Sequence, residues 1–448
     1  MVLVIGCGKS GLAVAEHFVG KQPVLAIDSR DQPPTVNALK KLSSEYTDVS
    51  VQLGSFNLAD DIVQKLDFAV VSPGVDTRHQ LFTQLAKYRV EVISEIECFA
   101  REVKDPVIAI TGSNGKSTVT DVVYQLLKSS GKRVAIGGNF GIPAVQLLQE
   151  NAEYYVLELS SFQLEATSSL RPEIGILLNV SPDHMDRYET YEDYRNAKLK
   201  LLELAQEIII NIDDDAGYEY KQKKAAVGVS RYSIQSSRKE STHIASIERL
   251  NNASHLSWNG RAIINVSELT LVGDHNYFNL LAGLSVGKLF DINDQQIKKV
   301  LTNYQGLAHR CQLVIKHQDI VWVNDSKATN VGATIAALQG ISFEDNQRII
   351  LIAGGDGKGA DFGPLAKAIK QYCKNLILMG KDAVKIAEAL GEYHTAHVDT
   401  MEQAVALAKD LAQPGDWVVL SPACASMDMF ENFEARGNSF VECIEALL

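Results

Sequence analysis

A lysine and two hydroxyl side chains follow two glycines in the segment 111–118, TGSNGKST. The segment comes directly after the apolar run Val107–Ile110 and before residues whose apolar positions have helical spacing. One positive charge, a hydroxyl for Mg²⁺ and free backbone N–H groups at a helix N-terminus are what ATP phosphates require. Ile110 stands where the G-x-x-x-x-G-K-[ST] loop has its first glycine, so this loop would be a shortened variant. We therefore predict ATP binding here; the alternative is a polar turn that only caps a helix.

A second glycine-rich turn, Gly6–Gly11, has the complete spacing G-x-G-x-x-G between a predicted strand and a predicted helix. Such glycines let backbone N–H groups approach a diphosphate, and Asp28, at the end of the next strand, could bond ribose hydroxyls. Alone, this turn suggests a dinucleotide-dependent oxidoreductase. It does not separate NAD from another nucleotide diphosphate, and a close-packed turn without a ligand is a further alternative.

Carboxylate, imidazole and amine groups follow the ATP loop. Glu158 ends a predicted strand, the segment 183–186 reads DHMD, and Lys198 lies in a predicted helix. A carboxylate at a strand end beside a phosphate loop suits Mg²⁺, directly or through water, and the imidazole of His184 could hold a second metal. Each residue alone has an ordinary structural explanation. Only their grouping after the loop favours a catalytic function.

Composition excludes several other classes of protein. The 448 residues carry a formal net charge of −12, which argues against a broad surface for nucleic acid or anionic lipid. We therefore expect neither nucleic acid nor a membrane as partner, and a local site for any anionic ligand. The six cysteines form no C-x-x-C pair, as is typical of reduced thiols. Without an apolar run of about 20 residues or a basic signal-peptide region, we expect a cytoplasmic protein, and we expect a monomer.

Short β-branched runs alternate with helical patterns, which predicts an α/β fold with parallel sheets. The helical pattern after residue 116 ends near Gly131, which would act as its C-cap. The acidic run Asp213–Asp215 is expected to be a solvated loop. The predicted strands are Val24–Asp28, Phe68–Val71, Val107–Ile110, Tyr155–Leu159, Ile208–Ile212, Val321–Asn324, Ile349–Ile352 and Val418–Leu420.

The length predicts about three domains, at roughly 100–200 residues each. No low-complexity linker divides the chain, so we place the boundaries where phosphate-type loops restart the α/β pattern. The predicted domains are residues 1–93, 94–306 and 307–448.

Eight segments in order along nearly the whole chain resemble the Mur ligases of peptidoglycan precursor synthesis. They are GSNGKST (112–118), LELSSFQLE (157–165), NVSPDHMDRY (179–188), GDHNYFN (273–279), HR (309–310), NDSKATN (324–330), GGDGK (354–358) and SPACAS (421–426). DSKATN is similar to the member of this family that adds D-glutamate.

The resemblance implies a Rossmann-like N-terminal domain, a central P-loop-type ATPase domain and a Rossmann-like C-terminal domain. The implied activity is ATP-dependent addition of D-glutamate to UDP-N-acetylmuramoyl-L-alanine through an acyl phosphate, giving ADP and phosphate. The implied cofactors are ATP and Mg²⁺, with two ions. The activity would serve cell-wall biogenesis, and through it cell shape and division.

The resemblance also implies roles for individual residues. The N-terminal domain would hold the uridine nucleotide, rather than NAD, through Lys9, Ser10, Asp28, Ser29, Arg30, Ser72, Pro73 and Gly74. ATP would contact Asn114, Gly115, Lys116, Ser117, Thr118, Asn276, Asn279, His309, Arg310, Asp325 and Lys327. The sugar-peptide would lie beside Asn139 and Ser160, and D-glutamate would lie among Thr329, Lys358, Ser426, Met427 and Phe433.

The metal ligands implied by the resemblance are Ser117, Glu158, His184 and Lys198, with Lys116, His184 and Lys198 as catalytic residues. Lys198 would be carbamylated, because a plain ammonium cannot bind a cation. The local sequence permits this, since Tyr194 and Leu202, four residues before and after Lys198, place it on an apolar helical face. A lysine on a buried face loses its proton more readily and can then capture CO₂. The alternative is a lysine that snorkels from the edge of the core.

Two other classes of function remain open. An oxidoreductase would explain Gly6–Gly11 and Asp28 but gives GSNGKST and Lys198 no use. A nucleotide-sensing binding module would keep the loops but release no phosphate. Other Mur ligases and folylpolyglutamate synthase differ in the amine that they accept.

Overall fold

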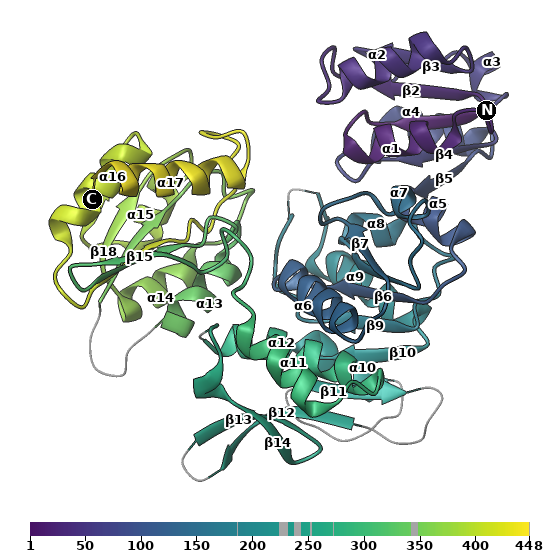
Figure 1. The fold of residues 1–448 in the computed structure, drawn as a ribbon. Helices are drawn as coiled ribbons and strands as arrows, with labels where there is room; N and C mark the ends of the chain where they lie inside the picture. Colours follow the sequence, from purple (N-terminus) through teal and green to yellow (C-terminus); the bar gives the residue numbers. More distant parts are fainter. Residues whose placement is uncertain are drawn as a thin grey trace.

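The computed structural model describes residues 1–185, 187–223, 232–236, 243–250, 253–271, 273–341 and 348–447. They form three α/β units that follow one another along the chain, each built around its own sheet (Figure 1). In this part of the chain no helix combines the length and the apolar character needed to cross a membrane.

The N-terminal unit has a parallel sheet in the order β3-β2-β1-β4-β5. Its central strands are buried on both faces, as expected for a parallel sheet that helices cover. The strands are β1 (Val2–Ile5), β2 (Val24–Asp28), β3 (Val49–Leu53), β4 (Phe68–Val71) and β5 (Glu91–Ser94). The helices are α1 (Lys9–Phe18), α2 (Val36–Glu45), α3 (Asp60–Val63), α4 (Gln80–Lys87) and α5 (Glu95–Glu102), the last leading into the central unit.

The central unit has a sheet in the order β14-β13-β12-β11-β10-β9-β6-β8-β7, parallel from β10 to β7 and antiparallel from β10 to β14. The strands are β6 (Val107–Thr111), β7 (Val134–Gly138), β8 (Tyr154–Glu158), β9 (Ile174–Leu177), β10 (Glu207–Ile210), β11 (Tyr232–Ser236), β12 (His243–Leu250), β13 (Ala253–Trp258) and β14 (Arg261–Asn265). The helices are α6 (Lys116–Ser129), α7 (Ala144–Leu147), α8 (Ser161–Glu165), α9 (Tyr191–Leu204), α10 (Asp215–Lys223), η1 (Val266–Glu268), α11 (Asp274–Leu289) and α12 (Asp294–Asn303).

The C-terminal unit has a sheet in the order β15-β16-β20-β17-β18-β19, in which only β15 runs antiparallel to its neighbour among the described residues. The strands are β15 (Gln312–His317), β16 (Ile320–Asn324), β17 (Ile349–Ala353), β18 (Cys373–Leu378), β19 (Thr395–His397) and β20 (Trp417–Leu420). The helices are α13 (Val331–Ile341), α14 (Gly363–Tyr372), α15 (Ala383–Leu390), α16 (Met401–Leu411) and α17 (Phe433–Leu447).

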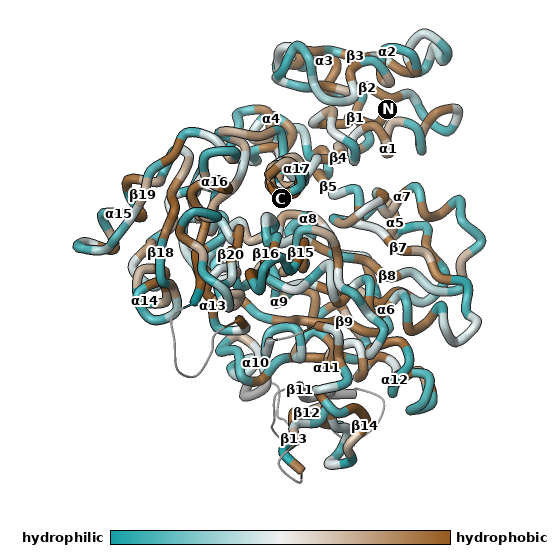
Figure 2. Tube along the Cα trace, turned by 60° about the vertical axis from the view of Figure 1, so that its left-hand side comes forward, coloured by the Kyte–Doolittle hydropathy of each residue, from teal (hydrophilic) through white to brown (hydrophobic). Residues whose placement is uncertain are grey.

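The strands supply the apolar interior, and the loops at their carboxyl ends supply polar groups. Figure 2 shows hydrophobic stretches along strands in the interior and hydrophilic stretches along the outer loops and helices. Helix α6 packs its apolar side into the central core and ends before Gly131, whose φ of 85° confirms the predicted C-cap position. All predicted strands overlap observed ones.

Residues 207–265 differ from the sequence-based expectation in two ways. The predicted parallel pairing holds from β10 to β7, and β11–β14 add an antiparallel extension that was not predicted. The acidic run is not a solvated loop throughout. The Asp214 carboxylate is partly buried and accepts hydrogen bonds from the backbone N–H groups of Val180 (3.0 Å) and Ala216 (3.1 Å), and Asp215 begins α10. Because it accepts from both N–H groups, this carboxylate ties the loop after β9 to the start of α10. Burial raises the pKa of Asp214.

Candidate active site

The ATP loop joins β6 to α6, and its lysine is folded over it. Lys116 Nζ donates to the carbonyl oxygens of Gly112 and Ser113, at 2.9 Å each. Burial lowers the pKa of Lys116, although the carboxylates of Glu158 and Asp183 favour its charged form. Gly115 has a φ of 82°, and a Cβ there would lie 2.3 Å from Asn279 Oδ1. The loop therefore needs glycine at this position and holds one fixed cation at the start of α6.

Glu158, at the end of β8, faces this loop. Its carboxylate accepts hydrogen bonds from the Ser117 hydroxyl and from Asn139 Nδ2, the latter at 2.7 Å. Burial alone would raise the pKa of Glu158, but the Lys116 charge and these hydrogen bonds outweigh it, so the pKa is lowered. Arg310, from the C-terminal unit, donates to Ser117 Oγ at 2.6 Å. A buried carboxylate, a hydroxyl and two cations from two units thus meet at one point.

Lys198 lies on the buried face of α9, as predicted, with 2% of its surface exposed. Its Nζ donates to the Gly112 carbonyl at 2.9 Å and lies 4.6 Å from the centre of the Tyr194 ring. Burial, together with the nearby Lys116 charge, lowers the pKa of Lys198 well below its ordinary value. An amine in this position gives up its proton readily.

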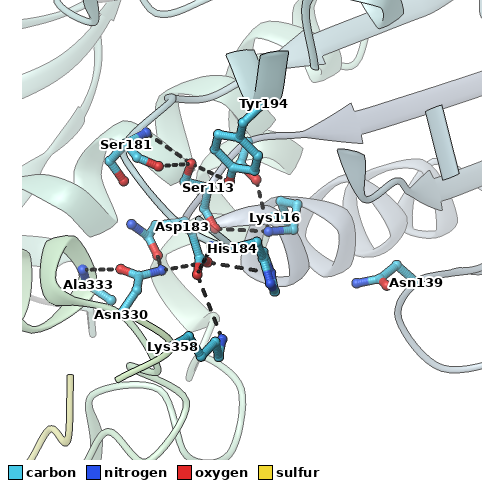
Figure 3. Close-up of polar contacts among 12 residues, drawn as sticks. Ser113, Lys116, Asn139, Ser181, Asp183, His184, Tyr194, Asn330, Ala333 and Lys358 are labelled. Atoms are coloured by element: carbon cyan, nitrogen blue, oxygen red, sulfur yellow. Dashed lines mark hydrogen bonds and ion pairs between the residues drawn. The ribbon is translucent and has the colours of Figure 1, made fainter. Parts of the chain in front are cut away.

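Asp183 links the central unit to the C-terminal unit (Figure 3). Its carboxylate accepts a hydrogen bond from Asn330 Nδ2 at 3.1 Å, lies 3.7 Å from Lys358 Nζ, and lies 3.7 Å from His184 Nε2. Burial would raise the pKa of Asp183, but the neighbouring His184 and Lys358 charges and the Asn330 hydrogen bond lower it. Asn330 Nδ2 also lies 3.2 Å from Asn114 Oδ1. The ATP loop and the C-terminal unit therefore share one polar network.

These groups surround a cavity of about 320 Å³ between the two units. The sequence-predicted residues that line it are Asn114, Gly115, Lys116, Ser117, Asn139, Glu158, Ser160, His184, Lys198, Arg310, Lys327, Thr329 and Lys358. The hydroxyl of Ser160 is also engaged in a capping box with Gln163 at the start of α8. Asp186 was also considered as a candidate and lies outside the described residues.

A second cavity of about 290 Å³ adjoins the first along the ATP loop. Its walls come from the central and the C-terminal units. The sequence-predicted residues on these walls are Asn114, Gly115, Thr118, Asn276, Asn279, Arg310, Asp325 and Lys327. His309, also predicted to contact ATP, is not among the lining residues; its Nδ1 lies 3.0 Å from Asn324 Nδ2.

A third cavity, of about 640 Å³, lies at the glycine turn of the N-terminal unit. Asp28 is buried at its wall, accepts a hydrogen bond from the Cys7 backbone N–H at 2.7 Å, and pairs with Arg30 at 2.7 and 2.9 Å. These contacts outweigh burial and lower the pKa of Asp28. All eight residues predicted for the uridine nucleotide line this cavity: Lys9, Ser10, Asp28, Ser29, Arg30, Ser72, Pro73 and Gly74.

Three residues predicted for D-glutamate do not line these cavities. Ser426 is buried, whereas Met427 has 72% of its surface exposed. The Phe433 ring lies 3.8 Å from Nζ of Lys327, which itself lines the cavities between the units. Conversely, sequence reasoning gave no role to Asn330 or to Asn179, whose Oδ1 accepts from the Asn114 N–H at 2.8 Å. Both lie inside segments that carried the resemblance, but the sequence did not indicate where their side chains point.

The structure thus has the three α/β units that the resemblance to Mur ligases implied, with the ATP-type loop in the central unit and a polar cavity between the central and C-terminal units. Three family descriptions match the chain in order: Mur ligase MurD-like, N-terminal domain (residues 1–94), Mur ligase middle domain (110–287) and Mur ligase, glutamate ligase domain (309–424). The chain belongs to the Mur ligase family.

Full-length relatives agree with this assignment, and a solved structure shares the fold. A Pseudomonas aeruginosa protein named UDP-N-acetylmuramoylalanine–D-glutamate ligase is 40% identical over 447 residues, covering 99% of this chain and 98% of that protein. A Coxiella burnetii protein of the same name is 39% identical over 452 residues, covering 100% of this chain and 99% of that protein. The crystal structure of UDP-N-acetylmuramate-alanine ligase from Thermotoga maritima has the same fold, with a TM-score of 0.60, 18% identity and coverage of 100% and 99%.

Proposed function

We infer that this protein is an ATP-dependent ligase that joins D-glutamate to UDP-N-acetylmuramoyl-L-alanine in peptidoglycan precursor synthesis. The observation that carries the inference is full-length similarity, near 40% identity, to proteins of that name. The ATP loop and the polar cavity between the units support the same conclusion.

Amide formation from a free carboxylate at neutral pH is uphill, because a carboxylate is a poor electrophile. Transfer of the ATP γ-phosphoryl group to the L-alanyl carboxylate gives an acyl phosphate and ADP. The amine of D-glutamate then attacks the acyl carbon, and the tetrahedral intermediate releases phosphate and a proton. The first step brings two anions together, so it needs cations at the meeting point.

Lys116 and Arg310 are placed to supply those cations. Both line one cavity together with Ser117 and Glu158, and Arg310 also lines the adjoining cavity along the ATP loop. We assign the smaller of these cavities, with Asn276, Asn279, Asp325 and Lys327, to the nucleotide. We assign the other to the reacting carboxylate and the incoming amino acid, which Lys358 and Thr329 would hold.

Mg²⁺ fits the donor set beside the loop. The Ser117 hydroxyl, the Glu158 carboxylate and the His184 imidazole all line one cavity, together with the buried Lys198 amine. A neutral amine in such a place can capture CO₂, and the resulting carbamate has the oxygen ligands that Mg²⁺ prefers. We propose that Lys198 is carbamylated and that these residues hold two Mg²⁺ ions. Bound Mg²⁺ would neutralise the charge of the phosphoryl oxygens.

The uridine nucleotide is assigned to the cavity at the glycine turn. Asp28 and Arg30 form a fixed pair there, and the first residues of α1, Lys9 and Ser10, line the same space. An oxidoreductase would use this turn for NAD but would give no role to the ATP loop. The family assignment therefore favours a nucleotide-sugar.

The test is phosphate release across a panel of UDP-muramoyl peptides and amino acids that includes both glutamate enantiomers. We expect release to require UDP-N-acetylmuramoyl-L-alanine, ATP, Mg²⁺ and the D enantiomer together. A nicotinamide absorbance change would instead support the oxidoreductase. Nucleotide binding without phosphate release would support a sensing module, and release with another amino acid would assign a different ligase.

A further inference from the structure

The uridine cavity and the phosphoryl-transfer cavity lie in different units of the protein. The first is on the N-terminal unit and the second is between the central and C-terminal units. Under the proposed function, on which this inference rests, one substrate must have its uridine end in the first and its L-alanyl carboxylate in the second. The separation of the two cavities must therefore match the length of the sugar-peptide, because a misplaced carboxylate cannot react.

Arg187 spans the gap between the walls of these cavities. Its Nη1 donates to the backbone carbonyl of Pro73 at 2.6 Å. Its guanidinium lies 3.9 Å from the centre of the Phe162 ring, and its Nη2 lies 3.7 Å from Glu165 Oε2. The side chain is only 18% exposed. One side chain thus holds a carbonyl of the N-terminal unit and an aromatic ring and a carboxylate of the central unit.

Two of the residues that Arg187 contacts line the uridine and phosphoryl-transfer cavities. Pro73 lines the uridine cavity, and Phe162 lines the phosphoryl-transfer cavity. The Phe162 ring also meets the His184 ring edge to face, with the centroids 5.0 Å apart. The Arg187 backbone N–H donates to the His184 carbonyl at 3.0 Å. The Arg187 backbone is therefore fixed in the turn that carries His184, while its side chain donates to Pro73 on the wall of the uridine cavity.

The chemistry of this contact suits arginine in particular. A planar guanidinium can stack on an aromatic ring and donate in its own plane at the same time, which an ammonium cannot do. A hydrogen bond with a charged donor is worth more than a neutral one. The hydrogen bond and the ring contact of Arg187 together fix the distance and the orientation of Pro73 relative to Phe162.

We propose that Arg187 is a positioning residue for the sugar-peptide substrate, which sets the span between the uridine cavity and the phosphoryl-transfer cavity. It acts through Pro73 and Phe162. By holding the two cavities in a fixed relation before binding, Arg187 lowers the free energy needed to place the uridine end and the carboxylate end of one ligand in their cavities. This is preorganisation. A ligand that fills only the uridine cavity gains nothing from it.

The test compares a whole ligand with a fragment of it on the full-length protein. In Arg187→Ala the KM for UDP-N-acetylmuramoyl-L-alanine should rise about tenfold or more, whereas the KM for ATP should change by less than about twofold. The Kd of UDP alone, measured by calorimetry, should also stay within about twofold. Arg187→Lys should recover part of the loss, since an ammonium can still donate to Pro73, and it serves as the second variant if Arg187→Ala does not fold.

Arg171→Ala is the matched control. Arg171 also donates to backbone carbonyls, those of Ser168 and Leu170, but both belong to its own loop, so every constant should be unchanged. An unchanged KM for the UDP-sugar substrate in both Arg187 variants would overturn the proposal. Equal weakening of UDP and of the whole substrate would also overturn it, since Arg187 would then only support the uridine cavity. Absence of phosphate release in the unaltered protein would refute the proposed function itself.

Discussion

Lys358 Nζ lies 3.7 Å from Asp183 Oδ1, so a cation of the C-terminal unit faces a carboxylate of the central unit. Asn330, from the C-terminal unit, holds the other oxygen of the same carboxylate. Under the proposed function Lys358 binds a carboxylate of D-glutamate. In the structure, the Asp183 carboxylate is therefore the same kind of partner for this lysine as a carboxylate of the amino acid would be.

Replacement of Lys358 should therefore weaken the amino acid selectively. In Lys358→Ala we expect the KM for D-glutamate to rise tenfold or more, while the KM for ATP changes by less than about twofold, because a charged contact is lost at one substrate only. Phosphate release at varied concentrations of each substrate measures this. Lys381→Ala, which removes an exposed lysine paired with Asp356, is the control. Equal effects on both substrates would contradict the assignment.

Lys116→Ala should abolish phosphate release and leave the uridine cavity intact. The reason is that Lys116 is the fixed cation of the ATP loop, whereas the uridine residues belong to another unit. Calorimetry with UDP should give an unchanged Kd, and a phosphate assay should give no turnover. Lys128→Ala, on the exposed side of the same helix, should keep full activity. Full activity in Lys116→Ala would refute the assignment of this loop to ATP.

Lys198→Ala should be nearly inactive, and a small carboxylate such as acetate should restore part of the activity by filling the space with an oxygen anion. Independently of activity, protein prepared with ¹³C-bicarbonate should show a carbamate carbon resonance that is absent from the variant. Lys200→Ala, two residues along the same helix, should keep both the resonance and the activity, since Lys200 Nζ donates to Glu165 instead. An active enzyme with an unmodified Lys198 amine would refute the carbamate.

Two glutamates on α5 should give opposite pH dependence of stability. Glu95 is buried, with Oε1 accepting from the Val145 N–H at 2.6 Å, and burial raises its pKa to about 7. Glu97 is also buried, but hydrogen bonds from Ser168, Ser169 and Arg101 outweigh burial and lower its pKa.

The folded state therefore holds the Glu95 proton more tightly than the unfolded state, whose pKa is near 4.5. The Glu95 contribution to stability is full below pH 4.5 and falls as the pH rises toward 7. We expect the stability of Glu95→Gln to be less sensitive to this rise than that of the unaltered protein, as followed by thermal unfolding between pH 3 and 8. Glu97→Gln should show the reverse, with its deficit greatest above pH 4.5, because the Glu97 contribution is lost on acidification. Parallel pH profiles for all three proteins would contradict this.

The sequence predicted the residues whose position follows from local geometry. Lys116 must open α6 because it ends a glycine loop after a strand, and Lys198 must face the core because Tyr194 and Leu202 lie one helical turn away on either side. The eight uridine-cavity residues were implied by the resemblance to Mur ligases; they lie together because they are at or after strand ends of one parallel sheet, and such ends share an edge. For Lys198 the period of the helix fixes the side-chain direction.

The residues that were missed depend on how separate units meet. Nothing near Asn330 indicates that it reaches Asp183, and nothing near Arg187 indicates that it reaches Pro73. Met427 was placed beside D-glutamate, but the segment that carries it turns its side chain to the solvent. The extension β11–β14 was missed because its strands mix polar and apolar residues without a continuous apolar run.

Under the proposed function, the hydrogen bond from Arg310 to Ser117 limits wasteful hydrolysis of ATP. The central unit alone carries one loop cation, and the second arrives only with the C-terminal unit, which also brings the lysine assigned to the amino acid. ATP bound to the central unit by itself would meet an incomplete set of charges and would hydrolyse slowly. Phosphoryl transfer would thus be fast only when the C-terminal unit, with its bound amino acid, is in place. Little ATP would then be lost to hydrolysis by water.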